Sequence, residues 1–541
     1  MSLRTLAGPG VFVALLAFGL WLHLTDLALA PLHQDEGLNG WLMLALHWWG
    51  RFEYLPSDNH GPLLYYLGAL LFGALGPSEL SLRLGPALAG ALLPLALLPA
   101  RRWFAGGGLW IAGLLLAVAP GLVYFSRAAI HETLLVLFSA LWAASLARFA
   151  ARPDRRWAAA CGAAAAGCFV TKETALITTA SLAVGALAAA AAWLAAQPRR
   201  ERRARLVGLV HEAARAAPVG LLVFAAGIVL FYSSFFGSAA GLRGFFEAFG
   251  PWIEYGTTGR NQGKPFGWFW ELMASTQGAY RWLALPAAAL ACLRRDPPGL
   301  ALAGWALASF LIYSALPYKT PWCVLEIDLP VLLMVGWAAG ACRIAAADAA
   351  RRPAMRIAAL VGFAAALAPA PWLLVRSLED IRDRYDDPAR PYVYHHTQRS
   401  FFAMLQDLFG VADASPGADG RGPRVVNSEA PDPVRWYLYT RGWTMERERY
   451  LENPAPPLPW IEEAEVVISS PRHLLELEKL VAATGAAWHE ESYPTRPGVA
   501  ATVFYRQALW DRYPAAGGRA GSPWPRPAIA SPAPPTPRVG P

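Results

Sequence analysis

Eleven apolar stretches, two of them short, constrain the fold of this chain more than any other feature. We place them at residues 8–28, 80–100, 108–126, 130–150, 156–171, 174–196, 216–236, 281–293, 299–316, 324–342 and 357–375. A helix needs about 20 apolar residues to cross a bilayer. With 55% apolar and 16% charged residues among 541, the composition excludes an ordinary soluble protein. The sequence predicts an α-helical polytopic membrane protein with about 11 transmembrane helices.

A further apolar stretch, residues 62–75, is left out of this count. It has only 14 residues, and runs of that length are more often interfacial or re-entrant. If it does not cross, one group of arginines falls on a single side, which the positive-inside rule identifies as the cytoplasm. The group comprises residues 101, 102, 152, 155 and 156, the cluster of arginines within 199–205, and residues 294, 295, 343, 351 and 352. The polar C-terminal third then lies outside.

The first stretch has a second interpretation. Arg4, the apolar run 11–22 and the small residues Ala28 and Ala30 also match a secretory signal with a cleavage site. The later spans hold the chain in the membrane in either case.

Ionisable residues gather at the predicted outer ends of the spans. Asp35 and Glu36 precede Trp41, Trp48 and Trp49, whose helical spacing is typical of a helix lying in the membrane interface. The other outer segments carry His60, Arg127, His131, Glu132, Lys172, Glu173, Lys264, Lys319 and Trp322. Because ionisable groups near hydrocarbon are costly, we predict a functional cavity that opens to the outside.

Lysine is rare in this chain. Only four of the 47 basic residues are lysines, at positions 172, 264, 319 and 479, and the first three lie in outer loops. A compact ammonium suits a phosphate or carboxylate held at one point. The alternative is that these lysines only extend along the membrane interface.

These residue types favour transfer of a group carried on an anionic lipid phosphate. Cations bind the phosphate as a leaving group, while a carboxylate accepts the proton of the acceptor. We predict Arg127, Lys172, Lys264 and Lys319 as ligands of the lipid phosphate, with a carboxylate at the water edge as the base.

Several motifs resemble the GT-C glycosyltransferases, which are integral-membrane enzymes such as protein O-mannosyltransferases and aminoarabinose transferases. The motifs are H-Q-D-E at 33–36, H-G-P-L-L-Y-Y at 60–66 and R-L-G-P-A-L at 83–88. S-R-x4-E at 126–132, K-E at 172–173 and K-x-P-W at 319–322 are similar to a bacterial and archaeal group of predicted glycosyltransferases, also described as flippase-activity-associated proteins. The likeness covers residues 1–375.

The resemblance implies that a sugar is transferred from a polyprenyl-phosphate-linked donor to an acceptor on the extracytoplasmic side. It implies that Asp35 is the catalytic base or orients the acceptor, with Glu36 beside it. His60 stands where relatives carry a basic residue near the lipid phosphate, so its role depends on protonation. We expect inversion at the anomeric carbon. His131, Glu132, Glu173 and Trp322 are the predicted supporting residues.

Structural explanations stay open at these positions. Asp35 and Glu36 also suit the first turn of a helix. His131, Glu132 and Glu173 also suit buried, hydrogen-bonded helix ends.

The sequence requires no cofactor. A divalent metal held by His33, Asp35, His60 and His131 has suitable ligand types, but their spacing matches no compact metal motif. The expected partners are a polyprenyl-phosphate sugar donor, membrane lipids and an acceptor that is a protein, a lipid or a polysaccharide. We expect no nucleic acid.

We divide the chain into a GT-C-like transmembrane domain at 1–376 with an outer juxtamembrane loop at 31–79, an extracytoplasmic α/β domain at 377–514, and a disordered Pro/Gly/Ala-rich tail at 515–541. The α/β domain rests on strand candidates at 424–427, 465–469 and 499–506 and helix candidates at 400–408, 433–442 and 471–485. Their alternation is typical of a small doubly wound domain.

Two other functions stay in play, a transporter or flippase component and a non-catalytic assembly partner for lipid-linked sugars. Transporters place substrate charges near the membrane midplane and contain repeated halves. Here the charges gather at one face and no repeat is seen. The sequence therefore favours a glycosyltransferase of the cell envelope, in a bacterial plasma membrane.

Overall fold

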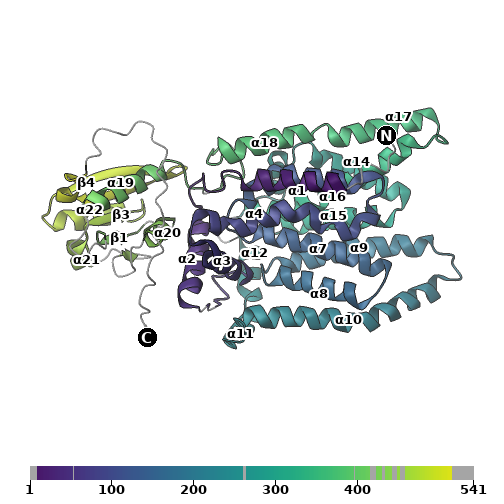
Figure 1. The fold of residues 1–541 in the computed structure, drawn as a ribbon, viewed down its shortest axis with the longest axis horizontal. Helices are drawn as coiled ribbons and strands as arrows, with labels where there is room; N and C mark the ends of the chain where they lie inside the picture. The colour runs from purple at the N-terminus through teal and green to yellow at the C-terminus, as the bar shows by residue number, and fades with distance from the viewer. Residues whose placement is uncertain are drawn as a thin grey trace.

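The computed structural model describes residues 9–50, 52, 54–259, 263–394, 396–414, 422–428, 433–441, 448–450 and 457–513. In these residues a bundle of helices carries a five-stranded sheet with short helices at one end (Figure 1). The predicted class, a helical membrane protein with a small α/β domain, is confirmed. The predicted tail at 515–541 lies outside the described residues.

The bundle contains α1 (Pro9–Leu24), α2 (Gln34–Trp49), α3 (Leu63–Leu75), α4 (Glu79–Ala96), α5 (Gly108–Val118), α6 (Pro120–Ser126), α7 (Glu132–Ala151), α8 (Arg155–Phe169), α9 (Ala175–Ala196), α10 (Arg202–Tyr232), α11 (Ala240–Glu247), α12 (Phe249–Thr258), α13 (Trp268–Thr276), α14 (Tyr280–Arg294), α15 (Pro297–Ala315), α16 (Leu325–Ala347), α17 (Pro353–Leu367) and α18 (Ala370–Arg382). Short 3-10 turns occupy Leu98–Trp103, Ala105–Gly107 and Pro321–Val324.

Every predicted span overlaps at least one of these helices. Within the described part of the chain, seven helical segments are long and apolar enough to cross a membrane, or eight if α5 and α6, bent by 55°, form one span. Helices α1, α8 and α14 have 15 or 16 residues, fewer than the roughly 20 that a straight span needs. The count of eleven spans therefore stays a prediction.

Close helix packing in the bundle depends on small residues. Helix α16 lies at the centre and is buried continuously from Leu325 to Ala341. At the contact of α8 with α10, a Cβ on Gly162 would lie 2.1 Å from the backbone oxygen of Gly220. Such close approach of backbones stabilises helix association in lipid, because burying apolar side chains contributes little free energy there.

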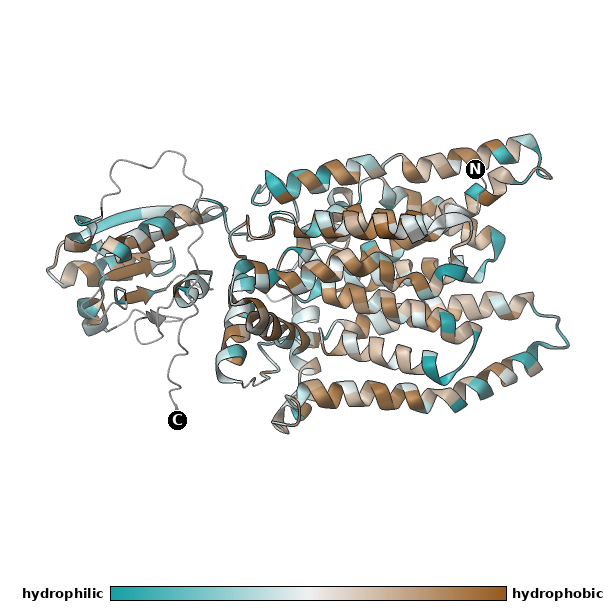
Figure 2. Cartoon of the chain, viewed as in Figure 1, coloured by the Kyte–Doolittle hydropathy of each residue, from teal (hydrophilic) through white to brown (hydrophobic). Residues whose placement is uncertain are grey.

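The two ends of the bundle differ in character. The turns between α9 and α10 and between α16 and α17 lie at the end away from the sheet (Figure 1), and hydrophilic residues mark them (Figure 2). Arg343 at this end donates from Nε to the carbonyl oxygen of Gly106 (2.5 Å). Helices α2 and α3 lie at the opposite end, beside the sheet. With 13 residues, α3 is short for a span.

The sheet has the strand order β2-β1-β3-β5-β4. Its strands are β1 (Val425–Asn427), β2 (Glu448–Tyr450), β3 (Val466–Ser469), β4 (Trp488–Arg496) and β5 (Val499–Arg506), and its helices are α19 (Phe401–Ala414), α20 (Pro433–Thr440), α21 (Leu458–Glu463), α22 (Leu474–Ala483) and α23 (Gln507–Trp510). β1 is parallel to β2 and β3, whereas β5 is antiparallel to β3 and β4. The sheet is therefore mixed, and only its β2-β1-β3 part has the predicted parallel arrangement.

Alternating side chains of the strands join two different cores. Val426, Val467 and Phe504 pack with residues of α21 and α22. Val425 and Ile468 face the other way, into a core that also contains residues of α2, α3, α19 and α20. Because strand side chains alternate between faces, one face of the sheet shares a hydrophobic core with the end of the bundle.

Candidate active site

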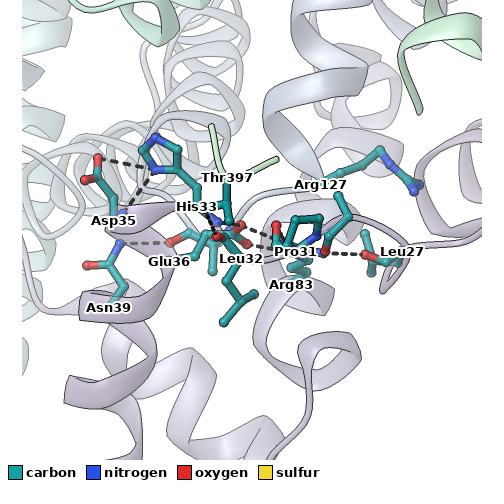
Figure 3. A network of polar contacts seen from close by, with 12 residues as sticks. Leu27, Pro31, Leu32, His33, Asp35, Glu36, Asn39, Arg83, Arg127 and Thr397 are labelled. Carbon is teal, nitrogen blue, oxygen red and sulfur yellow. Dashed lines mark hydrogen bonds and ion pairs between the residues drawn. The ribbon is translucent and has the colours of Figure 1, made fainter. Parts of the chain in front are cut away.

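Asp35 lies in the first turn of α2, and hydrogen bonds of His33 and Glu36 fix the backbone of this turn. His33 precedes the helix, and its Nδ1 accepts a hydrogen bond from the Asp35 backbone N–H (3.1 Å). The Glu36 carboxylate accepts one from the His33 backbone N–H (2.9 Å), as in a capping box. The Asp35 carboxylate lies 4.0 Å from His33 Nδ1, and the side chain is 41% exposed. It points away from Glu36 (Figure 3).

Glu36 is buried in an ion pair with Arg83. Its two carboxylate oxygens accept hydrogen bonds from Arg83 Nε (2.7 Å) and Nη2 (2.8 Å), and one also accepts from the Ala129 N–H (2.9 Å). Arg83 further donates to three carbonyl oxygens of residues 27–31. Burial alone would raise the pKa of Glu36, but the ion pair and the hydrogen bonds hold it below its ordinary value. Both carboxylate oxygens of Glu36 are therefore used in contacts that stabilise the fold.

A cavity of about 440 Å³ opens beside Asp35. Of the predicted site residues, it is lined by Asp35, His60, His131, Glu132, Lys172, Glu173 and Trp322. Apolar and aromatic side chains complete the wall, among them Tyr65, Leu176, Ile177, Trp252, Ile253, Tyr255, Ile312, Tyr313, Leu316 and Tyr318. A largely apolar cavity with a few convergent polar groups is typical of a ligand site.

Lys172 and Glu132 form an ion pair in this cavity, in which Lys172 Nζ donates to Glu132 Oε1. The two residues are 5% and 4% exposed. Glu132 is the first residue of α7, and Lys172 lies in the turn between α8 and α9, so helix ends bring them together. Among the described residues that line the cavity, Lys172 is the one lysine or arginine.

Glu173 organises a second polar cluster on the same wall. Its Oε2 lies 2.7 Å from His60 Nδ1, and its Oε1 accepts a hydrogen bond from the Tyr54 hydroxyl (3.2 Å). The His60 ring also stacks on Trp252, with 4.2 Å between ring centroids. Burial raises the pKa of Tyr54, and Glu173 raises it further, so its hydroxyl stays protonated. A carboxylate and an indole together fix the imidazole of His60 in one orientation.

His131 lies beside His60, with 5.1 Å between the ring centroids. It is 2% exposed, and its Nε2 has no hydrogen-bond partner within the described structure. This ring nitrogen is therefore available to a ligand in the cavity.

The structure does not bring three of the predicted cations into this cavity. Arg127 donates to the carbonyl oxygens of His23, Thr25 and Asp26 at the end of α1. Lys319 is 1% exposed, and its ammonium donates to the carbonyl oxygens of Leu316 and Lys264. Lys264 accepts one of these hydrogen bonds through its carbonyl oxygen, and it is not among the residues that line the cavity. Arg127 and Lys319 thus hold loops together through their contacts with backbone oxygens.

The four residues considered as possible metal ligands do not converge in the described structure. No group of three or more histidine, cysteine, aspartate or glutamate side chains in the described ranges is close enough to hold a metal ion. His33, for example, is occupied by the α2 N-terminus and by the carbonyl oxygen of Tyr394, 3.2 Å from its Nε2.

Sequence reasoning missed two parts of the site. Arg83 could have been identified from the sequence, because an arginine inside an apolar stretch costs free energy unless it is paired. The wall formed by α12 was also missed, although Phe249, Trp252, Ile253 and Gly256 share one face at helical spacing.

Comparisons with known proteins agree with this architecture. A model of the dolichyl-phosphate-mannose-protein mannosyltransferase family matches residues 59–227. The crystal structure of ArnT from Cupriavidus metallidurans bound to undecaprenyl phosphate covers 93% of this chain and 99% of its own, at 17% identity and a TM-score of 0.60. The chain has the GT-C fold.

Other solved structures share the GT-C fold. The apo state of the same ArnT covers 92% of this chain and 98% of its own, at 16% identity and a TM-score of 0.61. The archaeal oligosaccharyltransferase AglB from Archaeoglobus fulgidus, in complex with an inhibitory peptide and a dolichol-phosphate, covers 91% and 74%, at 13% identity and a TM-score of 0.53. No curated protein sequence gives a significant match. The predicted resemblance is confirmed at the level of the fold.

Proposed function

We propose that this protein transfers a sugar from a polyprenyl-phosphate-linked donor to an acceptor on the extracytoplasmic side of the membrane. One observation carries the proposal: a single cavity joins the exposed carboxylate of Asp35 to Lys172 and His60, at the end of the bundle next to the sheet. The arginine-rich turns at the opposite end support a cytoplasmic location for that end.

In the proposed reaction the acceptor attacks the anomeric carbon while Asp35 accepts the proton of its hydroxyl or amine. The bond between the anomeric carbon and the phosphate oxygen breaks, and its electron pair leaves with the polyprenyl phosphate. Attack from the side opposite the phosphate inverts the anomeric configuration. Glu36 acts only by fixing the first turn of α2, because its oxygens are already engaged.

Lys172 and His60 are the proposed contacts of the leaving phosphate. Because Glu132 balances the charge of Lys172, the lysine contributes N–H donors that are held in place before the reaction. His60 adds an imidazole that Glu173 holds in place. The ring of His131 offers a further nitrogen to the sugar or the phosphate.

The apolar part of the cavity supports a lipid donor. Leu176, Ile177, Ile253 and Leu316 line it and suit the first isoprene units of a polyprenyl chain. The ArnT structure was determined with undecaprenyl phosphate and the AglB structure with dolichol-phosphate, which supports a donor of this chemical class.

Release of polyprenyl phosphate from a panel of polyprenyl-phosphate sugars tests the proposal, with an extract of the native membranes as the source of acceptor. Asp35→Asn is expected to lower release by about 100-fold or more, and Lys172→Gln by a similar factor. Lys479→Gln, on the exposed side of α22, is the matched control and should release at the wild-type rate.

Three results would overturn the proposal. The first is wild-type release by folded Asp35→Asn protein. The second, which overturns the inverting displacement, is a product with retained anomeric configuration. The third is passage of the lipid-linked sugar across a vesicle bilayer with no release from any donor, which would favour the transport function instead.

A further inference from the structure

The segment that leads into Asp35 is held by residues from the far end of the sequence. The Leu32 backbone N–H donates to the Tyr437 hydroxyl (3.3 Å), and the Leu32 carbonyl oxygen accepts a hydrogen bond from the Thr397 hydroxyl (2.6 Å). Figure 3 shows Thr397 next to Leu32, one residue before His33 and three before Asp35. Both polar groups of the Leu32 backbone are therefore engaged by side chains of the C-terminal part.

The next two residues have similar contacts. Since His33 Nδ1 accepts from the Asp35 N–H, its Nε2 carries the proton and donates to the Tyr394 carbonyl oxygen (3.2 Å). The Gln34 side chain accepts a hydrogen bond from Arg496 Nη1 of β4 (3.0 Å). Each of the three residues before Asp35 thus touches Tyr394, Thr397, the helix α20 or the sheet.

Helix α20 packs directly on α2 and α3. Trp436 lies 5.6 Å from Phe72 and Tyr439 lies 5.0 Å from Trp41, between ring centroids. A Cβ on Gly40 of α2 would meet the Trp436 ring at 2.7 Å. Only glycine allows this approach, so α2 and α20 are fitted to each other at close range.

We propose that Thr397 and Tyr437 are positioning residues, which fix the Leu32 backbone and thereby the direction of the Asp35 carboxylate in the cavity. The inference rests on the proposed function of Asp35. Glu36 and Arg83 hold the first turn of α2 from the bundle, while Thr397 and Tyr437 hold its approach from the sheet side. When the backbone on both sides of Asp35 is fixed, its carboxylate stays aligned with the acceptor through the reaction.

The alternative is that these hydrogen bonds only attach the sheet to the bundle. Variants Thr397→Val and Tyr437→Phe separate the two roles, because each removes one polar group and nearly preserves shape. We expect kcat for sugar transfer to fall by about 10- to 100-fold with KM for the donor unchanged. Thr397→Ser keeps the hydroxyl and should recover most of kcat. Tyr493→Phe, which removes a hydrogen bond to Asp407 inside the sheet domain, is the matched control and should keep wild-type kcat.

Hydrogen exchange of the full-length protein in lipid provides a second measurement that does not depend on activity. Thr397→Val and Tyr437→Phe should speed exchange of the backbone amides of residues 32–36, whereas Tyr493→Phe should not. Unchanged exchange in this segment would overturn the inference. So would accelerated exchange with wild-type kcat, provided that Asp35→Asn abolishes transfer in the same assay.

The failure of the proposed function gives a different result. If Asp35→Asn itself transfers sugar at the wild-type rate, Asp35 is not the base, and the positioning role falls with it. Faster hydrogen exchange in the Thr397→Val variant would then show only that Thr397 attaches the sheet to the bundle.

Discussion

Glu36 and Arg83 meet as a two-pronged ion pair that is buried on both sides, with each residue 2% exposed. Removing one partner leaves the other charge without compensation, which costs about 3–5 kcal/mol in buried pairs. We therefore expect Glu36→Gln to lower the unfolding temperature of the protein in detergent strongly. Glu201→Gln, which breaks an exposed ion pair with Arg205, should change stability by less than about 1 kcal/mol. Equal effects of the two variants would contradict this.

The same pair predicts how stability depends on pH. The folded protein holds the pKa of Glu36 below the ordinary value of 4.5, so the folded state favours the charged carboxylate. This contribution is fully present above pH 4.5 and is lost as the pH falls through the lower folded pKa. Unfolding temperatures measured from pH 7 downwards should show the gap between wild type and Glu36→Gln closing below pH 4.5. A gap that closes already near neutral pH would rule out Glu36 as the titrating group.

Helix packing in the bundle leads to a third prediction. Gly162→Ala places a methyl group against the backbone oxygen of Gly220, and we expect it to destabilise the protein by about 1–3 kcal/mol. Gly208→Ala in α10 meets no atom within 4 Å and should stabilise it by up to about 1 kcal/mol, because alanine favours the helix. Thermal unfolding of both variants in the same detergent measures the difference. Equal unfolding temperatures would show that α8 and α10 are not in this contact.

Trp252 is expected to matter for donor use rather than for the fold. Its ring holds His60 from the cavity side, and an aromatic contact contributes about 0.5–1.5 kcal/mol. Trp252→Leu should therefore reduce kcat/KM for the lipid-linked donor by about 2- to 10-fold. Trp282→Leu, at a ring 54% exposed on α14, is the control. Loss of activity in both variants to the same degree would show a general effect of removing tryptophan.

The helical bundle was predictable because it depends on patterns that are local in the sequence. The apolar stretches locate the helices, and the arginines alone indicate which turns share an end of the bundle. Strand β4 was not predictable in the same way: residues 488–496 are mostly polar and contain Pro494. A strand at the edge of a sheet tolerates both features, so little in its composition marks it.

The candidate site was predictable only in part. Asp35, Lys172 and Glu173 were identified from residue type and from their location at helix ends, and they do share a cavity. The same reasoning selected Lys319, whose ammonium is taken up by backbone carbonyl oxygens. The sequence shows that a cation is present. Whether its ammonium contacts a ligand or a backbone carbonyl oxygen depends on the path of the two loops that carry Lys264 and Lys319.

The hydrogen bond between Leu32 and Tyr437 joins residues 405 positions apart. A chain is synthesised from its N-terminus, so the bundle helices leave the ribosome well before α20 exists. During that interval the Leu32 backbone, which leads into α2, lacks its C-terminal partners Thr397 and Tyr437. By the proposed mechanism, the Asp35 carboxylate reaches its final alignment only after α20 has folded, although Asp35 is synthesised early. A chain cut short by a premature stop codon after the bundle would then occupy the membrane without consuming the lipid-linked sugar.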